Sequence, residues 1–142
     1  MKKYKIGYTT GVFDLFHIGH LNLLKRAKEM CDYLIVGVSS DELCESYKGK
    51  KAIIPYEERK AIIEAIKYVD KVVPQITQDK CEALDRLRFD VMFHGDDWKD
   101  SALFTETEKV FKKRGTDIIY FPYTQGTSST TLAEALRKVL GN

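Results

Sequence analysis

The chain has 142 residues, of which 44% are hydrophobic and 31% are charged, and this composition is typical of a single domain covering 1–142. It excludes the collagen-like, disordered and disulfide-stapled classes. Its 23 Lys and Arg residues against 21 Asp and Glu residues leave a net charge of +2, which gives no overall argument for a nucleic-acid or a membrane partner.

Short apolar runs alternate with helical patterns along the whole chain. The first half predicts, in chain order, a strand at Lys5–Thr9, a helix at Ile18–Met30, a strand at Tyr33–Ser39, a short helix capped by Asp41 and a helix from Pro55 to about Tyr68. The second half predicts a strand at Lys71–Val73, a helix at Asp79–Arg88, a strand at Val91–Phe93, a helix at Ala102–Arg114, a strand at Asp117–Phe121 and a helix at Ser128–Leu140. This alternation predicts a Rossmann-like three-layer α/β/α fold with a five-stranded parallel sheet in the order 3-2-1-4-5.

Three loops at one edge of this predicted sheet are unusually polar. They follow the first, fourth and fifth strands and read TGVFDLFHIGH, HGDDWKD and YTQGTSSTT. Ligands of open parallel sheets bind beyond the carboxyl ends of the strands, where the strand order reverses. The three loops therefore predict a polar pocket at this edge.

The first polar loop brings two histidines to the start of a helix. His17 and His20 lie three residues apart, Gly11 follows the strand, and Gly19 leaves room where a side chain would crowd a ligand. Two imidazoles beside the N–H groups of a helix start form an anion site suited to a phosphoryl group. The alternative is that both histidines are helix-start residues satisfied by their neighbours. A zinc site would need further ligands that the surrounding sequence does not supply.

The other two polar loops are each open to two interpretations. The cluster Thr124, Gly126, Ser128, Ser129 and Thr130 suits an oxyanion cradle at a helix start, although a helix cap alone would use one or two of its hydroxyls. The segment GDDW at 95–98 could hold sugar hydroxyls or a metal ion carried by phosphates, or could form a turn with a packed indole.

A basic segment separates the short second helix from the third. Lys48, Lys50 and Lys51 flank a glycine and either form a solvated loop or fold over a phosphate chain as point charges. Arg59 follows in the next helix. It either pairs with glutamates on the surface of its own helix or reaches the same phosphates.

The cysteines and the hydropathy pattern indicate a compartment. Cys31, Cys44 and Cys81 have no CxxC spacing, which argues against a disulfide framework and against a zinc ribbon. The first apolar run is too short for a signal peptide, and no stretch approaches the roughly 20 apolar residues of a membrane helix. We therefore expect a cytoplasmic protein.

Taken together, these motifs resemble the HxGH cytidylyltransferase family. The resemblance covers nearly the whole chain and is carried by GVFDLFHIGH at 11–20, SSDEL at 39–43, YEERK at 56–60, YVDKVVP at 68–74, GDDW at 95–98 and TQGTSST at 124–130. It implies transfer of CMP from CTP to a small phosphomonoester with release of pyrophosphate. Glycerol 3-phosphate, giving CDP-glycerol for a cell-surface polymer or a lipid head group, is the first candidate acceptor. Another polyol phosphate, choline phosphate or ethanolamine phosphate is the alternative.

The resemblance also implies a role for each candidate residue. His17 and His20 would hold the α- and β-phosphates of CTP, with Lys48 closing on them from the opposite side. Nucleotide contacts are implied for Gly11, Val12, Phe13, Gly19, Lys50, Arg59, Gly95, Asp96, Thr124, Gly126, Ser128, Ser129 and Thr130, and acceptor contacts for Asp14, Asp97 and Trp98. It further implies a Mg²⁺ ion carried by the CTP phosphates, no metal site built by the protein alone, and a homodimer.

Four positions depart from the family pattern: Thr10, Val12, Tyr123 and Gln125. Two of them bear on the choice of substrate and on how it is held. Tyr123 stands where the family carries an arginine for the triphosphate, and Arg59 or a lysine of 48–51 is the expected substitute. Thr10 stands where choline-phosphate enzymes carry an acid, which disfavours a cationic acceptor. Two other functions are weighed: an adenylyltransferase of the same fold and a non-catalytic nucleotide-binding module. GDDW combined with TxGxSS/T favours CTP over ATP, and the intact HxGH motif favours an enzyme.

Overall fold

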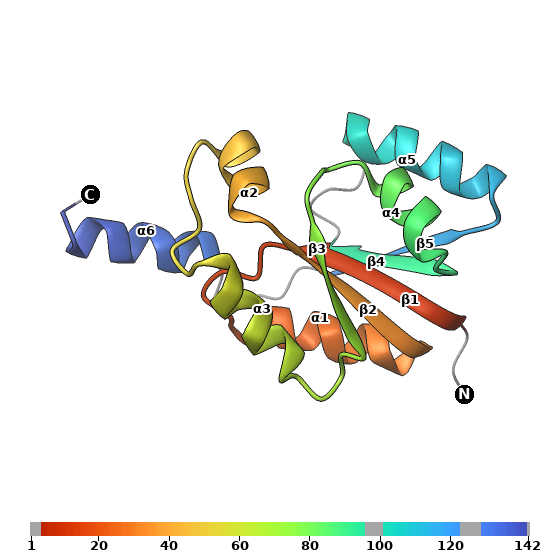
Figure 1. Ribbon diagram of the computed structural model, residues 1–142, viewed down its shortest axis with the longest axis horizontal. Helices are drawn as coiled ribbons and strands as arrows, with labels where there is room; N and C mark the ends of the chain where they lie inside the picture. Colours follow the sequence, from red (N-terminus) through yellow and green to blue (C-terminus); the bar gives the residue numbers. More distant parts are fainter. Residues whose placement is uncertain (1–3, 96–100, 123–128, 142) are drawn as a thin grey trace.

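The computed structural model describes residues 4–95, 101–122 and 129–141, which form a sheet flanked by helices (Figure 1). Its five strands are β1 (Tyr4–Gly11), β2 (Cys31–Ser39), β3 (Lys71–Gln75), β4 (Val91–Gly95) and β5 (Asp117–Phe121). All neighbours pair in parallel, in the order β3-β2-β1-β4-β5. The predicted Rossmann-like fold and strand order are confirmed.

Helices cover both faces of the sheet, and a hydrophobic core lies on each side. The helices are α1 (Ile18–Glu29), α2 (Asp41–Lys48), α3 (Tyr56–Glu64), α4 (Lys80–Leu87), α5 (Ala102–Lys113) and α6 (Ser129–Val139). Figure 1 shows α1 and α3 on one face and α4 and α5 on the other. Leu24 of α1 and Ile63 of α3 pack into one core, while Leu84 of α4 and Phe111 of α5 pack into the second.

The central strands are buried on both faces because of this double cover. From Leu34 to Ser39, every residue of β2 is buried, which explains why this segment is continuously apolar instead of alternating. β1 is longer than the sequence predicts, because its ends at Tyr4 and Gly11 still find partners in β2. The central strands therefore give a rigid platform for the loops at their carboxyl ends.

Local capping moves several helix boundaries away from the predicted ones. Ser40, not Asp41, caps α2, since its hydroxyl accepts the backbone N–H of Leu43 at 3.1 Å. α2 continues through Lys48 and ends where Gly49 adopts a left-handed φ of 72°. The helix predicted to run from Pro55 to Tyr68 stops at Glu64.

The chain still packs against the core after α3 ends at Glu64, but it does so without continuing the helix. After Glu64 the chain continues in tight turns, with backbone bonds from Ile66 to Ile63 and from Val69 to Ile66. The apolar side chains at 66, 68 and 69 still pack against the core of the α1 and α3 face. Apolar spacing therefore predicted a longer helix than the structure contains. The residues at 66, 68 and 69 reach the same core from turns and not from an α-helix.

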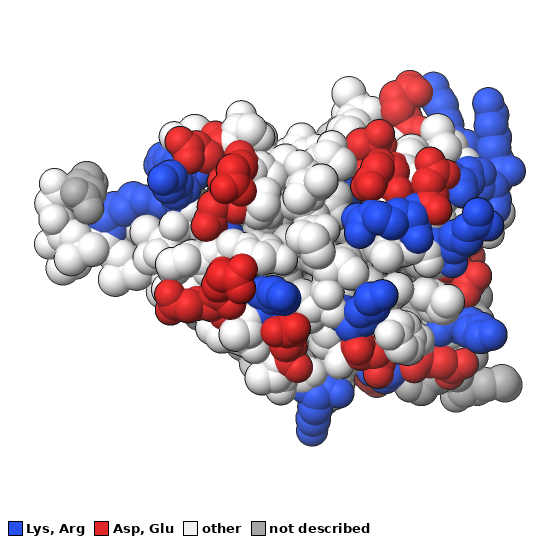
Figure 2. Space-filling model, viewed as in Figure 1, with Lys and Arg blue, Asp and Glu red and all other residues white. Residues whose placement is uncertain are grey.

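α6 lies at one end of the molecule, beside the loop that joins α2 to α3 (Figure 1). Arg137 links the two segments by donating from Nη2 to the carbonyl of Lys51 at 3.3 Å. Acidic and basic side chains are interspersed over the face drawn in Figure 2. Within the described residues, no helix has the length and apolar character needed to cross a bilayer.

Candidate active site

A cavity of about 510 Å³ opens at the carboxyl edge of the sheet. Its walls come from the loop after β1, from α2 and the loop after it, from the β3–α4 connection, from the end of β4 and from α5 and α6. Of the candidates from the sequence, the cavity is lined by Gly11, Val12, Phe13, Asp14, His20, Lys48 and Lys50.

Other candidates lie elsewhere or cannot be placed. His17 and Gly19 start α1 directly beside the cavity residue His20, whereas Gly95 ends β4 and Arg59 lies in α3, behind the residues that line the cavity. The candidates Asp96, Asp97, Trp98, Thr124, Gly126 and Ser128 are outside the described residues. Ser129 and Thr130 form the first turn of α6.

The two histidines form a reciprocal cap on α1. His17 is the N-cap residue, and its Nδ1 accepts the backbone N–H of Gly19 at 3.0 Å. Nδ1 of His20 accepts the backbone N–H of His17 at 3.2 Å, and the two rings stack with centroids 4.0 Å apart. Both Nδ1 atoms therefore satisfy N–H groups of the helix start, as the alternative interpretation of the two histidines expected. In a neutral imidazole whose Nδ1 accepts, Nε2 carries the proton and acts as a donor.

Burial keeps both imidazoles neutral at pH 7. It lowers the pKa of His17, and burial followed by the neighbouring His17 lowers the pKa of His20 from 6.5 to about 3. The rings of Phe13 and Phe16 pack near the His20 ring, with centroids 5.3 Å away in both cases. The pair therefore offers neutral N–H donors, and a positive charge on either ring is disfavoured.

A basic side of the cavity is formed by the end of α2, the following loop and α6. Lys48, Lys50 and Lys51 line the cavity here together with Arg137. The three lysines are exposed, and Arg137 is half-buried. The basic segment therefore borders the cavity while its lysines remain exposed to solvent. We call this group the basic side.

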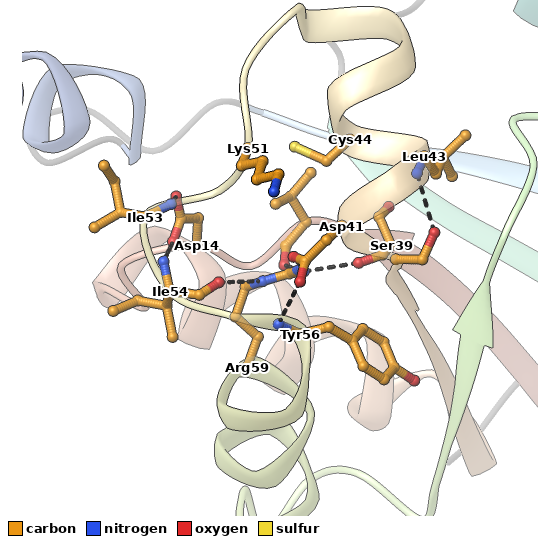
Figure 3. A network of polar contacts seen from close by, with 12 residues as sticks. Asp14, Ser39, Asp41, Leu43, Cys44, Lys51, Ile53, Ile54, Tyr56 and Arg59 are labelled. Atoms are coloured by element: carbon orange, nitrogen blue, oxygen red, sulfur yellow. Dashed lines mark hydrogen bonds and ion pairs between the residues drawn. The ribbon is translucent and has the colours of Figure 1, made fainter.

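Arg59 supports the wall of the cavity from within (Figure 3). It is only 1% exposed, which contradicts the expected surface pairing with glutamates. Its Nε donates to the carbonyl of Ile54 at 2.8 Å, and its Nη1 donates to the carbonyls of Val12 and Ser39 at 2.8 Å each. Nη2 pairs with Asp41 at 2.5 Å. The guanidinium is thus bonded to the protein itself, and the expected contact with CTP phosphates is not supported by this placement.

Asp14 has a structural partner that the sequence does not reveal. Its two carboxylate oxygens accept the backbone N–H groups of Ile53 at 2.7 Å and Ile54 at 2.9 Å (Figure 3). The residues on either side, Phe13 and Leu15, adopt left-handed φ angles of 56° and 51°, which are unfavourable for side chains of this size. Asp14 therefore ties the loop after β1 to the loop after α2, which differs from the expected acceptor contact.

Sequence reasoning missed one part of the cavity, the connection between β3 and α4. Gln78 and Lys80 line the cavity from this side, near His94 of β4 and Phe104 of α5. Lys80 is the first residue of α4, where a cation opposes the helix dipole, and it is 8% exposed. A lysine directly after an N-cap aspartate is the signal that could have indicated this residue.

The chain is similar to known proteins in sequence and in fold. A model of the family described as cytidylyltransferase-like matches residues 8–136. A glycerol-3-phosphate cytidylyltransferase of Bacillus subtilis is 42% identical over 130 residues, which cover 90% of this chain and 94% of the relative. An FAD synthase of Thermococcus sibiricus is 35% identical over 145 residues, covering 98% of this chain and 95% of the relative. The crystal structure of a lipopolysaccharide core biosynthesis protein from Thermoplasma volcanium superimposes with a TM-score of 0.72 at 27% identity, covering 87% of this chain and 99% of that one.

Proposed function

The chain belongs to the cytidylyltransferase-like family, and we propose that it transfers CMP from CTP to glycerol 3-phosphate, giving CDP-glycerol and pyrophosphate. The observation that carries this proposal is the 42% identity to the Bacillus subtilis glycerol-3-phosphate cytidylyltransferase over nearly the full length of both chains. The HxGH histidines and the basic side of the cavity supply donors and cations suited to such polyanionic substrates.

The chemistry requires positioning more than proton removal. An oxygen of the acceptor phosphate attacks the α-phosphorus of CTP, a new P–O bond forms, and the bond to the β-phosphate breaks to release pyrophosphate. The second pKa of a phosphate monoester is about 6, so the nucleophile is already a dianion at pH 7 and needs no strong base. The protein must hold two anions in line and stabilise the charge that gathers on the leaving oxygen.

The histidine pair suits the second of these tasks. Nε2–H groups held by the α1 cap can donate to the α- and β-phosphate oxygens as their charge grows. Because the rings are neutral and fixed by their own Nδ1 bonds, they require no reorientation when the transition state forms. The lysines of the basic side add positive charge around the leaving pyrophosphate.

We include a Mg²⁺ ion carried by the CTP phosphates in this proposal. Of the cavity carboxylates, Asp14 already accepts two backbone N–H groups, which leaves Glu134 as the other described carboxylate in the lining. This donor set fits an ion held mainly by substrate oxygens, with few protein ligands. Such an ion would neutralise part of the triphosphate charge.

The proposal also covers compartment and assembly. We infer the cytoplasm because Cys31, Cys44 and Cys81 form no disulfide with one another, which suits a reducing compartment. We infer a homodimer because the edge strand β3 ends beside Ile76, which is 68% exposed, and Ile62 of the adjacent α3 is 42% exposed. Light scattering of the purified chain at micromolar concentration tests the dimer, and a monomer mass would overturn it.

A matrix of nucleotides and phosphomonoesters tests the reaction. CTP and ATP are each combined with glycerol 3-phosphate, choline phosphate, ethanolamine phosphate and FMN in the presence of Mg²⁺. Pyrophosphate release measures the rate, and ³¹P spectroscopy identifies the diphosphate product. We expect turnover with CTP and glycerol 3-phosphate. Turnover restricted to ATP and FMN would replace the proposal with the activity named for the Thermococcus sibiricus relative, and no turnover with any pair would contradict an enzymatic function.

A further inference from the structure

A buried chain of hydrogen bonds links the centre of the sheet to one wall of the cavity. The hydroxyl of Tyr8 in β1 donates to Oε1 of Gln75, the last residue of β3, and Nε2 of the same amide donates to the carbonyl of Thr77. Tyr8 is fully buried, and Gln75 is 1% exposed. Both polar atoms of the Gln75 amide are therefore bonded within the protein, as burial requires.

Burial fixes the direction of both bonds. It raises the pKa of Tyr8 to about 12, so the hydroxyl keeps its proton and is a donor. Oε1 of Gln75 must then accept, which turns the NH2 group of the amide toward Thr77. An acidic side chain at position 75 would lose the donor, and an apolar side chain would lose both bonds.

A glycine in the intervening strand leaves room for this chain. β2 lies between β1 and β3, and its Gly37 pairs with Thr10 on one side and with Val73 on the other. A Cβ atom at Gly37 would collide with the hydroxyl oxygen of Tyr8. The missing side chain therefore allows Tyr8 to reach Gln75 across the face of β2.

The chain of hydrogen bonds ends in the connection between β3 and α4. Oγ1 of Thr77 accepts the backbone N–H of Asp79 at 3.2 Å, and Asp79 is the N-cap residue of α4. Gln78 of this connection and Lys80, the first residue of α4, line the cavity. The bond from Gln75 to Thr77 therefore holds the segment that presents these two side chains.

Burial of apolar side chains does not hold this connection in place, because its apolar residue, Ile76, is 68% exposed. Tyr8 and Gln75 are not part of the cavity lining, so neither contacts a ligand directly. We propose that Tyr8 and Gln75 are positioning residues, which hold the β3–α4 connection in the shape in which Gln78 and Lys80 meet a bound substrate.

The substrate at this wall follows from the proposed function, on which this part of the inference rests. Figure 1 shows α4 and α5 on one side of the carboxyl end of the sheet, and α2 with its following loop on the other. In an in-line displacement the attacking and leaving oxygens lie on opposite sides of the α-phosphorus. With pyrophosphate on the basic side, the β3–α4 connection faces the acceptor. Loss of the buried chain should therefore weaken binding of the acceptor more than binding of CTP.

Steady-state kinetics with a matched control test the assignment. Tyr8→Phe removes the hydroxyl and keeps the ring, and Gln75→Met removes the amide at nearly the same volume. Tyr4→Phe is the control, because Tyr4 also donates to a side chain, that of Asp117 at 2.6 Å, but at the amino end of the same strand. We expect Tyr8→Phe and Gln75→Met to raise the KM for the acceptor by roughly 3- to 10-fold, the equivalent of one lost neutral hydrogen bond, with kcat and the KM for CTP within about 2-fold. Equal rises in both KM values, or the same result for Tyr4→Phe, would overturn the assignment.

The double variant Tyr8→Phe/Gln75→Met shows whether the two residues act as one chain. Both single substitutions remove support from the same Thr77 carbonyl, so we expect the acceptor KM of the double variant to equal that of Gln75→Met within about 2-fold. Rises that add up would show that the two side chains act separately, and would contradict a single chain that ends at Thr77.

Hydrogen exchange without substrates separates this inference from the proposed function. The exchange of the backbone N–H groups at 79–82 is compared between the full-length wild type, Tyr8→Phe and Tyr4→Phe. We expect exchange in this segment to be roughly 3- to 10-fold faster in Tyr8→Phe and unchanged in β2, because the lost bond loosens the connection locally. Unchanged exchange at 79–82, or a rise spread over the whole sheet, would refute the positioning role even if the enzyme is active. Faster exchange confined to this segment would uphold it even if glycerol 3-phosphate is not the acceptor.

Discussion

The two imidazoles at the start of α1 combine a structural and a chemical role. Each ring uses Nδ1 to satisfy a backbone N–H of the helix start, and this bond determines which nitrogen carries the proton. A histidine in this arrangement is oriented by the same helix that it caps. Substitutions must therefore separate the loss of the cap from the loss of the Nε2–H donor.

Replacing His20 by glutamine makes this separation. The Gln side chain at the third position of the helix can still accept the N–H of His17 as part of a capping box, but it does not offer the imidazole N–H at the same place. We expect kcat for His20→Gln to fall by roughly 10²- to 10³-fold, with a free energy of unfolding within about 1 kcal/mol of the wild type. His20→Ala, which also loses the cap, is the comparison in urea unfolding. A near-normal kcat in both variants would assign the histidines a purely structural role.

The low pKa of His20 also predicts a pH dependence of stability. In the unfolded chain His20 takes up a proton near pH 6.5, whereas in the folded chain it does so only near pH 3. The unfolded state binds the additional proton between these values, so the contribution to stability is complete above pH 6.5 and is lost as the pH falls through this window. Urea unfolding of wild type and His20→Gln at about pH 7.5 and about pH 5 measures it. The wild type should lose more stability than the variant, and equal losses would contradict burial of the ring.

The loop between α2 and α3 is fixed by side chains from outside it. Asp14 accepts two of its backbone N–H groups, and Arg59 holds its Ile54 carbonyl together with the ends of β1 and β2. The lysines of the basic side stand on this loop or directly before it. Substitution of Asp14 or Arg59 should therefore weaken binding of the nucleotide phosphates, even though both side chains bond to the protein and not to the ligand.

Asp14→Asn tests this coupling between the loops. The amide retains one acceptor oxygen and loses the second, so one N–H at 53 or 54 is left unsatisfied, at a cost of about 1–3 kcal/mol in the free energy of unfolding. We expect the KM for CTP to rise while the KM for the acceptor changes little, because the displaced groups belong to the basic side. Glu58→Gln, at an exposed position of α3, is the control. A selective rise in the acceptor KM would restore the acceptor contact that the sequence implied for Asp14.

The sequence predicted the helices and strands better than it predicted the side-chain contacts between them. The strands and helices were recognised from apolar spacing, but the helix limits depended on Ser40 and Gly49, whose capping roles need the folded backbone. Arg59, in a helix rich in charged residues, resembles a surface residue. Only the folded chain shows that four groups from three separate segments converge on it. Lys80 was missed because the connection before it, QITQD at 75–79, is short and contains neither the glycines nor the histidines that mark the loops after the first and fourth strands. The spacing of apolar residues predicts nearby helices and strands. Whether a charged side chain is buried depends on segments that are distant in the sequence.

The whole chain contributes to one cavity, from Thr10 at the end of β1 to Arg137 in α6. Both sheet faces, the central strands and the last helix meet there, so a ligand contacts elements that are far apart in the sequence. Binding should consequently stabilise the global fold by mass action, and not a single loop.

Thermal unfolding with ligands measures this effect. At a CTP concentration about 100 times its dissociation constant, the gain is about 2.7 kcal/mol, which for a domain of this size corresponds to a rise of roughly 8 °C in Tm. We expect CTP with Mg²⁺, and CDP-glycerol alone, to raise the midpoint, and GTP to have a much smaller effect. An unchanged midpoint with CTP and CDP-glycerol at saturating concentration would show that the cavity does not bind them.

The left-handed residues that flank Asp14 have a kinetic consequence. Phe13 and Leu15 hold unfavourable backbone angles, and the backbone N–H groups of residues 53 and 54, bonded to Asp14, keep them there. The conformational entropy of this wall is therefore lost during folding, before a nucleotide arrives. Encounter with CTP then needs no ordering of the loop after β1, and the rate of association should be governed by diffusion and electrostatic steering instead of loop rearrangement.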